Sequence, residues 1–481
     1  MAGMAGMAGM AGGYHGGAGL VVEPCGTRSA PQSPDRPMTP PAFTPDLARA
    51  LPGPTWLADR RSAAAERFGA APLPTPKDEV WRYSRIDRLD LEAFGPVRAP
   101  AQPAPSLVEA AVASADRFGA RAGLVVTVDG SVAAGPPIEV SGLTVARPAG
   151  GASDDAAGRV LGSVASEPAD FGLLNDAFAP DPVVITFDPG APPADPVVVV
   201  HVVGAAGAGS AAFPRTVVRA GEGAHGAVIA LTVGADTLTG GSAGGEGHPH
   251  LVVPVVELDV AAGARLAYVA VEQPDAGAWH LASQVGRVGA DGLLQSFTVA
   301  LGGSYARQRT DATLSGEGAR SELRAAYLGR GDQMLDFRTL QDHVAPRTTS
   351  DLLFTGAVRE QAHSVYSGMI RIRQGAVKSD AAQTNHNLVL DDGAHADSVP
   401  NLDIEENDVR CSHGSTVGPV DEEQRYYLET RGVPSDEAER LIVRGFFADI
   451  ATQVPVPAAE SVVRDLLAAR LAAPAPGGSR G

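Results

Sequence analysis

Between about residue 182 and about residue 418, short apolar runs alternate with turn residues. The runs are four to eight residues long and rich in β-branched side chains, as in "PVVITFDPG" and "PVVVVHVV", which is typical of β-strands. No long amphipathic helix pattern interrupts the series. The sequence therefore predicts a strand-rich region over 182–418.

A Gly-Ala pair recurs after these predicted strands. Alanine follows glycine at Ala224, Ala264, Ala290, Ala319, Ala376 and Ala394, and Ala362 follows Gln361 in a similar place. The spacings are irregular, but they fall in the range of one coil or part of a coil of a β-solenoid. Such a fold buries its apolar face by stacking one coil on the next. We favour a solenoid; a β-sandwich is the alternative.

The residues before this region show apolar spacings that are typical of helices. In 45–181, "DLARALPGPTWLADRRSAAAERF" and "LVEAAVASADRFG" predict helices. The stretch "AGLVVTVDGSVAAG" predicts a short hairpin. We therefore expect a mostly helical N-terminal domain over 45–181.

The last part of the chain, 419–481, is helical again. Asp421 resembles an N-cap before "EEQRYYLETR", and Gly432 suits the end of that helix. The apolar positions of the next helix form one predicted stripe, made of Ala438, Leu441, Ile442, Phe446 and Ile450. These helices carry more apolar residues than a small hairpin needs. Docking onto a partner is therefore expected; packing against each other is the alternative.

The first 44 residues are rich in Gly, Ala, Ser and Pro and hold little to bury. We expect a disordered tail over 1–44 that contains Cys25 as a free thiol. There is no Lys or Arg before Arg28 and no continuous apolar segment, which argues against a secretory signal. No apolar run is long enough for a membrane span. The expected location is the cytoplasm.

Composition narrows the classes of partner. The 481 residues carry a formal net charge of -18, which repels phosphate backbones and makes nucleic acid a poor candidate. Two cysteines cannot form a disulfide framework, and a reducing compartment fits them. A phosphate-binding loop of the G-x-x-x-x-G-K-[ST] type is absent from the sequence, so the chain is not itself a P-loop ATPase.

Cys411 and His413 are the candidate metal-binding or catalytic residues. In an extended strand, residues two apart point to the same face, and thiolate and imidazole both bind zinc or iron. A closed zinc site needs four ligands and an iron–sulfur cluster usually takes four cysteines. This chain cannot supply four thiolates, although a second subunit could. A Cys–His nucleophile pair and an inert buried cysteine remain alternatives.

Several longer stretches resemble a known family. The segments "RTTSDLLFTGAV", "DVRCSHGSTVGPVDEEQ" and "AERLIVRGFFADI" look like the SufD family of the SUF iron–sulfur cluster assembly machinery. The N-terminal "PTWLADRRSAAAERF" and "KDEVWRYSRIDRL" are also similar to it, so the resemblance covers about Pro45 to Ile450. The sister family, SufB, is the alternative. SufB is expected to carry further core cysteines, whereas only Cys411 stands in this core.

The resemblance implies a mainly β fold: a right-handed parallel β-helix core over 182–418, flanked by N-terminal and C-terminal helical domains. It implies a non-catalytic scaffold that pairs with a SufB-like subunit and supports iron entry and cluster assembly. Cys411 and His413 would be iron or cluster ligands at the SufB interface. A β-solenoid carbohydrate-active enzyme is the rival from another class.

The resemblance also implies contact with SufC, an ABC-type ATPase, through the C-terminal domain at 419–481. The residues it points to are Arg431, Gly432, Leu441, Arg444, Gly445 and Phe446. It further implies a transient iron–sulfur cluster or iron shared with the partner, and reduced flavin in the complex. Whether the subunit forms a homodimer when alone is left open by the sequence.

Overall fold

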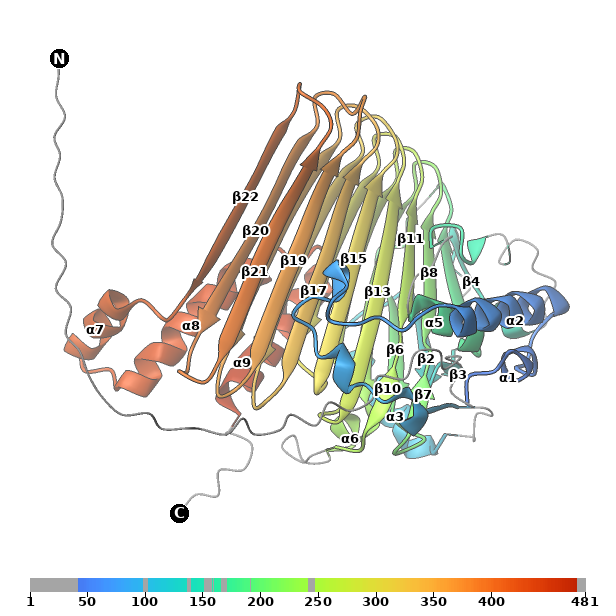
Figure 1. The fold of residues 1–481 in the computed structure, drawn as a ribbon, viewed down its shortest axis with the longest axis horizontal. Helices are drawn as coiled ribbons and strands as arrows, with labels where there is room; N and C mark the ends of the chain where they lie inside the picture. The colour runs from blue at the N-terminus through green and yellow to red at the C-terminus, as the bar shows by residue number, and fades with distance from the viewer. Residues whose placement is uncertain are drawn as a thin grey trace, which may run out of the picture. The chain divides into compact units, whose positions relative to one another are not determined.

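The computed structural model describes residues 42–97, 103–135, 140–150, 158, 160–165, 171–190, 192–240 and 247–473. Residues 1–41 of the predicted tail, with Cys25, lie outside this description. The described part of the chain is dominated by two large β-sheets, here called sheet A and sheet B. Helices flank them at both ends of the chain (Figure 1).

Sheet A follows the order β21-β19-β17-β15-β13-β11-β8-β5-β4, with three short strands beside this path. Its strands are β4 (Leu143–Ala146), β5 (Val183–Phe187), β8 (Arg215–Ala220), β11 (Val255–Val260), β13 (Ala278–Val288), β15 (Tyr305–Leu314), β17 (Met334–His343), β19 (His363–Ile372) and β21 (His395–Ile404), with β1 (Gly95–Pro96), β7 (Ser210–Ala212) and β10 (His250–Val252).

Sheet B follows the order β22-β20-β18-β16-β14-β12-β9-β6-β2-β3. Its strands are β2 (Gly123–Val128), β3 (Ser131–Ala134), β6 (Val197–Val203), β9 (His225–Gly234), β12 (Arg265–Gln273), β14 (Leu293–Ala300), β16 (Arg320–Gly329), β18 (Thr349–Val358), β20 (Asp380–Val389) and β22 (Arg410–Gly418).

From β11 onward successive long strands alternate between the two sheets, and neighbours within each sheet run parallel. Arg320, Thr349, Asp380 and Arg410 occupy equivalent places in register, so each coil uses about 30 residues, within the usual range for solenoid repeats. This parallel stacking confirms the mainly β solenoid. It excludes the β-sandwich, whose strands are antiparallel.

Most of the Gly-Ala pairs lie at corners where the chain passes from sheet A to sheet B, whereas Gly393–Ala394 lies at the corner from β20 of sheet B to β21 of sheet A. At Gly223–Ala224, Gly263–Ala264 and Gly318–Ala319 the glycine has φ between 62° and 72° and the alanine is buried. Glycine adopts this left-handed backbone without steric cost. The methyl group that follows fits inside the narrow corner, which explains why the pair repeats.

The C-terminal helices cover the outer face of sheet B. Val443 and Phe447 of α8 (Ser435–Ala451) and Val463 of α9 (Pro457–Ala472) are buried in one cluster with Phe297 and Leu328 of the sheet. The helices α3 (Pro105–Asp116) and α6 (Ala235–Leu238) also pack against this cluster.

The predicted stripe on α8 is partly wrong. Ala438 and Ile450 are buried, but Leu441 is 40% exposed and Val443 and Phe447 take the central places. Ile442 and Phe446 of the predicted stripe pack against the same cluster but are only partly buried. The buried face is thus shifted towards Val443 and Phe447, because Phe446 and Phe447 are adjacent and both apolar, and sheet B buries Phe447 more fully.

The N-terminal elements cover the outer face of sheet A. Phe43, Trp81 and Phe178 share a cluster with Tyr305 and Met334 of the sheet. The elements that surround them are α1 (Pro45–Arg49), α2 (Thr55–Ala70), η1 (Glu79–Trp81), η2 (Ile86–Arg88), η3 (Leu91–Ala93) and α5 (Gly172–Phe178), and η4 (Pro148–Gly150) lies further along the chain.

The predicted hairpin is formed by β2 and β3, which are antiparallel. Its turn residues Asp129 and Gly130 have φ of 47° and 88°, as a two-residue hairpin turn requires. Strand β2 also pairs in parallel with β6, so the residues before 182 contribute strands as well as helices. Within the described ranges, no helix combines the length and apolarity that crossing a membrane requires.

Candidate functional site

The solenoid ends in two edge strands, β21 in sheet A and β22 in sheet B (Figure 1). Among the described strands, β21 pairs with β19 and β22 pairs with β20, and the other edge of each is open. Leu402, Ile404 and Val417 on these strands are 37%, 43% and 46% exposed. Proteins generally protect open strand edges, because such edges pair readily with other chains. The open end is therefore a candidate interface.

Cys411 lies at the start of β22, opposite the buried Ala381 of β20. The thiol is half-buried beside the cluster of Ile370 and Ile372. Burial, and secondarily the negative charge of Asp380, raises the pKa of the Cys411 thiol. The thiol is therefore held protonated, and it becomes a good ligand only when a metal ion or another positive group approaches.

His413 stands two residues further along β22, opposite Gln383, and is exposed. Strand alternation places His413 on the same side of β22 as Cys411. The structure thus brings the two predicted ligands to one side of an open edge. Among the described residues, neither belongs to a group of three or more potential ligands. The arrangement is half a site that a second chain could complete.

The predicted ATPase-contact residues lie on and after α7 (Glu422–Thr430) and on α8. Leu441, Arg444 and Gly445 are exposed. Phe446 is partly buried and meets Phe447 edge to face, with ring centroids 5.4 Å apart. Gly432 has φ of 86°, as expected of the residue that ends a helix.

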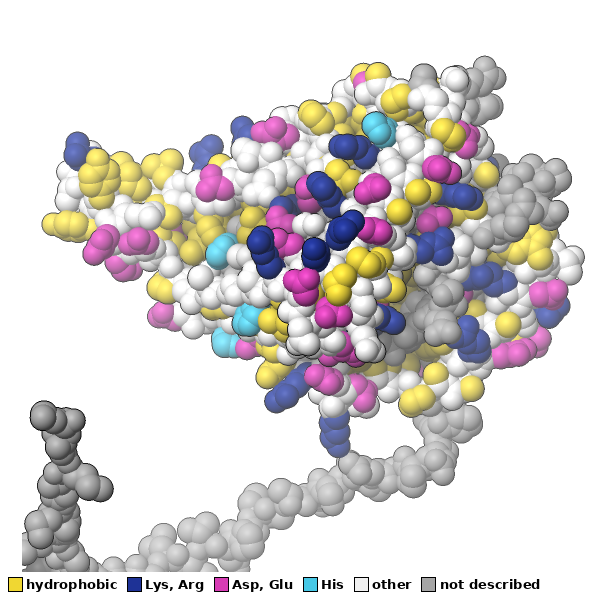
Figure 2. Space-filling model, turned by 90° about the horizontal axis from the view of Figure 1, so that it is seen from above, with side chains coloured by type: hydrophobic (Ala, Val, Ile, Leu, Met, Phe, Trp, Pro, Cys, Tyr) yellow, Lys and Arg dark blue, Asp and Glu magenta, His cyan; other side chains and the backbone are white. Residues whose placement is uncertain are grey.

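Two exposed aromatic residues of α7 are not among the contact residues predicted from the sequence. Tyr426 and Tyr427 are 68% and 57% exposed, and the guanidinium of Arg431 lies 4.9 Å from the centre of the Tyr427 ring. The available signal in the sequence was the pair of adjacent tyrosines in the mostly polar segment "EEQRYYLET". Figure 2 shows apolar side chains gathered with acidic ones at the end of the molecule that carries α7. Exposed aromatic groups of this kind are typical of protein interfaces.

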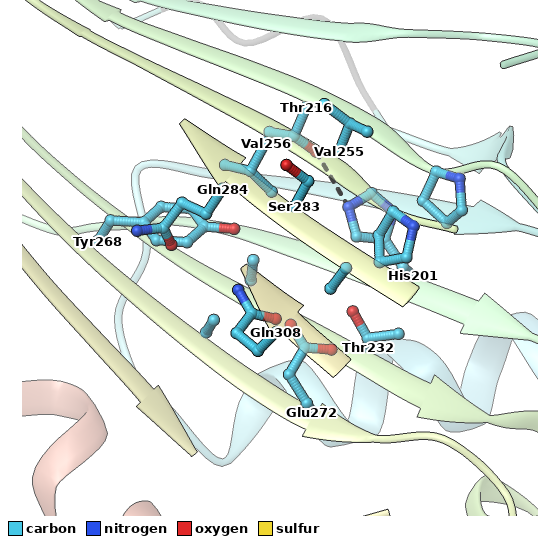
Figure 3. A pocket seen from close by; sticks show the side chains of 15 residues that line it. His201, Thr216, Thr232, Val255, Val256, Tyr268, Glu272, Ser283, Gln284 and Gln308 are labelled. Atoms are coloured by element: carbon cyan, nitrogen blue, oxygen red, sulfur yellow. Dashed lines mark hydrogen bonds between the residues drawn. The ribbon is translucent and has the colours of Figure 1, made fainter. Parts of the chain in front are cut away.

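A polar void of about 10 Å³ lies inside the solenoid, between the two sheets. Figure 3 shows His201, Glu272, Gln284 and Gln308 around it, and His201 Nε2 lies 3.0 Å from Thr216 Oγ1. Burial lowers the pKa of His201 to about 4, so the imidazole is neutral. The void has room for about one water molecule. It is too small for flavin.

Comparisons with known proteins find relatives of the solenoid and of the helices that follow it. The family model for the SUF system FeS cluster assembly SufBD core domain matches residues 202–446. An iron–sulfur cluster assembly SufBD family protein of Mycobacterium tuberculosis is 40% identical over 210 residues, 42% of this chain and 53% of the relative.

Two relatives are named iron–sulfur cluster assembly protein SufD. The one from Escherichia coli is 30% identical over 223 residues, covering 46% of this chain and 52% of the relative. The one from Bacillus subtilis is 36% identical over 143 residues, covering 30% and 33%. The matches thus span about half or less of the length of these relatives. Since the family model covers half of the chain, including β22 and most of α8, the protein belongs to the SufBD core family of the SUF iron–sulfur cluster assembly system.

Proposed function

We propose that the chain is a SufD-type, non-catalytic scaffold subunit of a cytoplasmic SUF complex. In this proposal it pairs with a SufB-like subunit at the open end of the solenoid and binds a SufC-type ABC ATPase through its C-terminal helices. The observation that carries the proposal is the half-site of Cys411 and His413 on the open strand β22. The relatives named SufD support the choice of subunit.

The cargo of the half-site would be iron or a nascent cluster. Cys411 would supply a thiolate and His413 a neutral imidazole, and the SufB-like subunit would supply the remaining ligands. Because the pKa of the Cys411 thiol is raised in the free chain, binding of the metal has to displace its proton. The thiol is then protected until iron and the partner are both present.

The C-terminal helices offer a link between the ATPase and the half-site. Strand β22 ends at Gly418, and the buried Val420 leads directly to Asp421, the N-cap of α7. Asp421 accepts hydrogen bonds from the backbone N–H groups of Glu423 and Gln424, which fixes the start of α7. A displacement of α7 by the ATPase would therefore be transmitted to β22, and would open the interface around the half-site.

The ligand proposal is tested by co-expressing the chain with the SufB-like and ATPase subunits of its host. We expect the His413→Ala and Cys411→Ser variants to assemble the complex but to lose cluster formation, measured by visible absorption and iron content. Ser412→Ala is the matched control, because Ser412 lies between them on the opposite side of β22. Unchanged cluster formation in both ligand variants would show that the half-site does not hold the cluster.

The ATPase contact is tested by changing exposed side chains rather than by truncation, because α8 and α9 bury apolar residues against sheet B. We expect the Tyr426→Ser/Leu441→Glu variant to lose copurification with the ATPase while still pairing with the SufB-like subunit. Val80→Glu is the control, since Val80 is 51% exposed and lies in η1, outside the C-terminal helices. Retention of the ATPase by the double variant would contradict this assignment.

A further inference from the structure

A second group of potential ligands lies on sheet A, on the last two strands of its open end. His363 begins β19 and His395 begins β21, and the two residues are opposite each other in the parallel register. Asp397 stands two residues after His395, so strand alternation puts it on the same face. The coil repeat therefore brings His363 beside two residues that lie more than thirty positions later in the sequence.

The three side chains converge closely. His363 Nε2 lies 2.8 Å from Asp397 Oδ2, and His395 Nε2 lies 3.3 Å from Asp397 Oδ1. The centroids of the two imidazole rings are 5.0 Å apart. One ligand atom from each residue lies within 4.8 Å of the others, and this is the one such group among the described residues.

The three side chains are only partly buried, so an ion in solvent could reach them. The side chains of His363 and Asp397 are 23% and 27% exposed, and that of His395 is 66% exposed. In the connecting turn before His395, Asp391 lies 3.7 Å from Arg359, which offsets its charge. The charge that favours a cation over an anion at the group is therefore that of the Asp397 carboxylate.

Two imidazole nitrogens and one carboxylate oxygen form the donor set of zinc sites with an open position and of non-haem iron sites. The present hydrogen-bonding distances are close to the separations between ligands of one ion, which sits about 2.0–2.2 Å from each donor. Small side-chain rotations would admit the ion. Each Nε2 would give up the hydrogen bond to Asp397 and bind the ion as the neutral tautomer with its proton on Nδ1, and any extra proton would go to solvent.

We propose that His363, His395 and Asp397 bind a divalent first-row transition metal ion, such as Zn²⁺ or Fe²⁺, that bridges β19 and β21. The site is separate from Cys411 and His413, which lie on the last strand of sheet B. The inference does not depend on the proposed function. A bound ion would fasten the edge strand of sheet A to its neighbour, since an ion that binds only the folded chain stabilises it.

The test is a titration of the full chain, purified free of metal, with Zn²⁺ followed by calorimetry and with Co²⁺ followed by visible absorption. We expect one ion to bind, with affinity at least tenfold lower in His395→Ala and in Asp397→Asn. Loss of one ligand usually has an effect of at least this size. The midpoint of thermal unfolding should rise with Zn²⁺ in the unchanged chain and not in His395→Ala.

Two controls separate this site from others. The Cys411→Ser/His413→Ala variant should bind the ion as the unchanged chain does, and so should His386→Ala, which removes a partly buried histidine of β20. Because His395 is largely exposed, its replacement should not disturb folding, which circular dichroism will check. Unchanged binding by His395→Ala, or no binding by the unchanged chain, would overturn the proposal and leave a metal-free network of hydrogen bonds.

Discussion

Gly356 lies in β18 directly against the ring of Tyr327 in β16, its partner in register. The Cβ atom of an alanine at this position would stand 1.8 Å from Cε2 of Tyr327. Tyr327 is fully buried, and its hydroxyl donates to Asn387 Oδ1 at 2.6 Å. The ring therefore has no free space into which it could move.

We expect Gly356→Ala to lower the free energy of unfolding by about 1–3 kcal/mol, the usual cost of overpacking a core. Urea unfolding followed by circular dichroism measures this. Gly414→Ala is the matched control in sheet B, because its nearest neighbours are atoms of Thr384 at 3.8 Å. An equal loss of stability in both variants would show that the close approach to Tyr327 is not the cause.

His343 is buried inside the solenoid and hydrogen-bonded at both ring nitrogens, with Nδ1 2.7 Å from Thr348 Oγ1 and Nε2 2.8 Å from Ser350 Oγ. Burial lowers the pKa of His343 to about 4, although Asp342 acts in the opposite direction. An unfolded histidine titrates at about 6.5. Between these two values the unfolded chain binds a proton that the folded chain does not.

Stability should therefore fall as the pH falls from about 6.5 towards 4, with His343 contributing up to about 1.4 kcal/mol per pH unit. Urea unfolding between pH 7 and pH 5 tests this before most carboxylates titrate. In His343→Gln the slope should be shallower, with the part due to His201 remaining, since burial lowers the pKa of His201 to about 4 as well. An unchanged slope would contradict the assignment.

Helix α5 is joined to sheet A by buried charges. The guanidinium of Arg215 in β8 donates to Asp176 Oδ1 at 2.7 Å and to Glu257 Oε1 at 2.6 Å, and its side chain is 1% exposed. Glu257 also accepts from the backbone N–H groups of Gly162 and Ala165. One arginine thus fixes the helix, a loop and two strands relative to one another.

Arg215→Met should lower the free energy of unfolding by about 3 kcal/mol or more, because it leaves buried carboxylates without their counter-charge. Arg219→Met is the control on the same side of β8. Its guanidinium is largely exposed and lies 3.9 Å from Asp259, so the expected loss is about 1 kcal/mol or less. Thermal and urea unfolding compare the two, and similar losses would argue against the role of the buried network.

The sequence predicted the strands and corners well, because their signals are local. Apolar runs mark the strands, and the pairs such as Gly263–Ala264 mark the corners. The buried face of α8 was harder to predict, because Phe446 and Phe447 are adjacent and both fit an apolar stripe. Packing against the outer face of sheet B buries Phe447 more fully than Phe446. The buried network around Arg215 could not be predicted from the sequence, because its partners Asp176 and Glu257 come from distant parts of the chain.

Of the candidate sites, the half-site could be predicted and the group on sheet A could not. Cys411 and His413 are two residues apart on one strand, so their proximity needs only strand alternation. His363 and His395 meet across a coil, and the length of each coil varies with its turns. The sequence shows His395 and Asp397 two residues apart. Without the register between strands, His363 could not be recognised as the third ligand.

At the scale of the whole molecule, the open end of the solenoid is predicted to be the surface that binds the proposed partner. Ile404→Lys places a charge on the exposed edge of β21, where Ile404 lies opposite the buried Ile372. Charged side chains on strand edges oppose pairing with another chain. We expect association with the SufB-like subunit to weaken at least tenfold, or about 1.4 kcal/mol, without a change in unfolding.

Binding of the immobilised partner, measured over a concentration series, tests this expectation. Val344→Lys is the control, since Val344 is 39% exposed and lies in the turn after β17. If Ile404→Lys and Val344→Lys bind the partner equally well, the interface lies elsewhere on the molecule.

Each coil of the solenoid rests only on the coils beside it, so cooperativity passes from neighbour to neighbour. The last coil, with β21 and β22, has a neighbour on one side alone among the described strands. It should therefore fray first, and its amide hydrogens should exchange with solvent faster than those of β15 or β16. The chain would then present Cys411 and His413 on its least stable segment, and pairing with the proposed partner would order that segment.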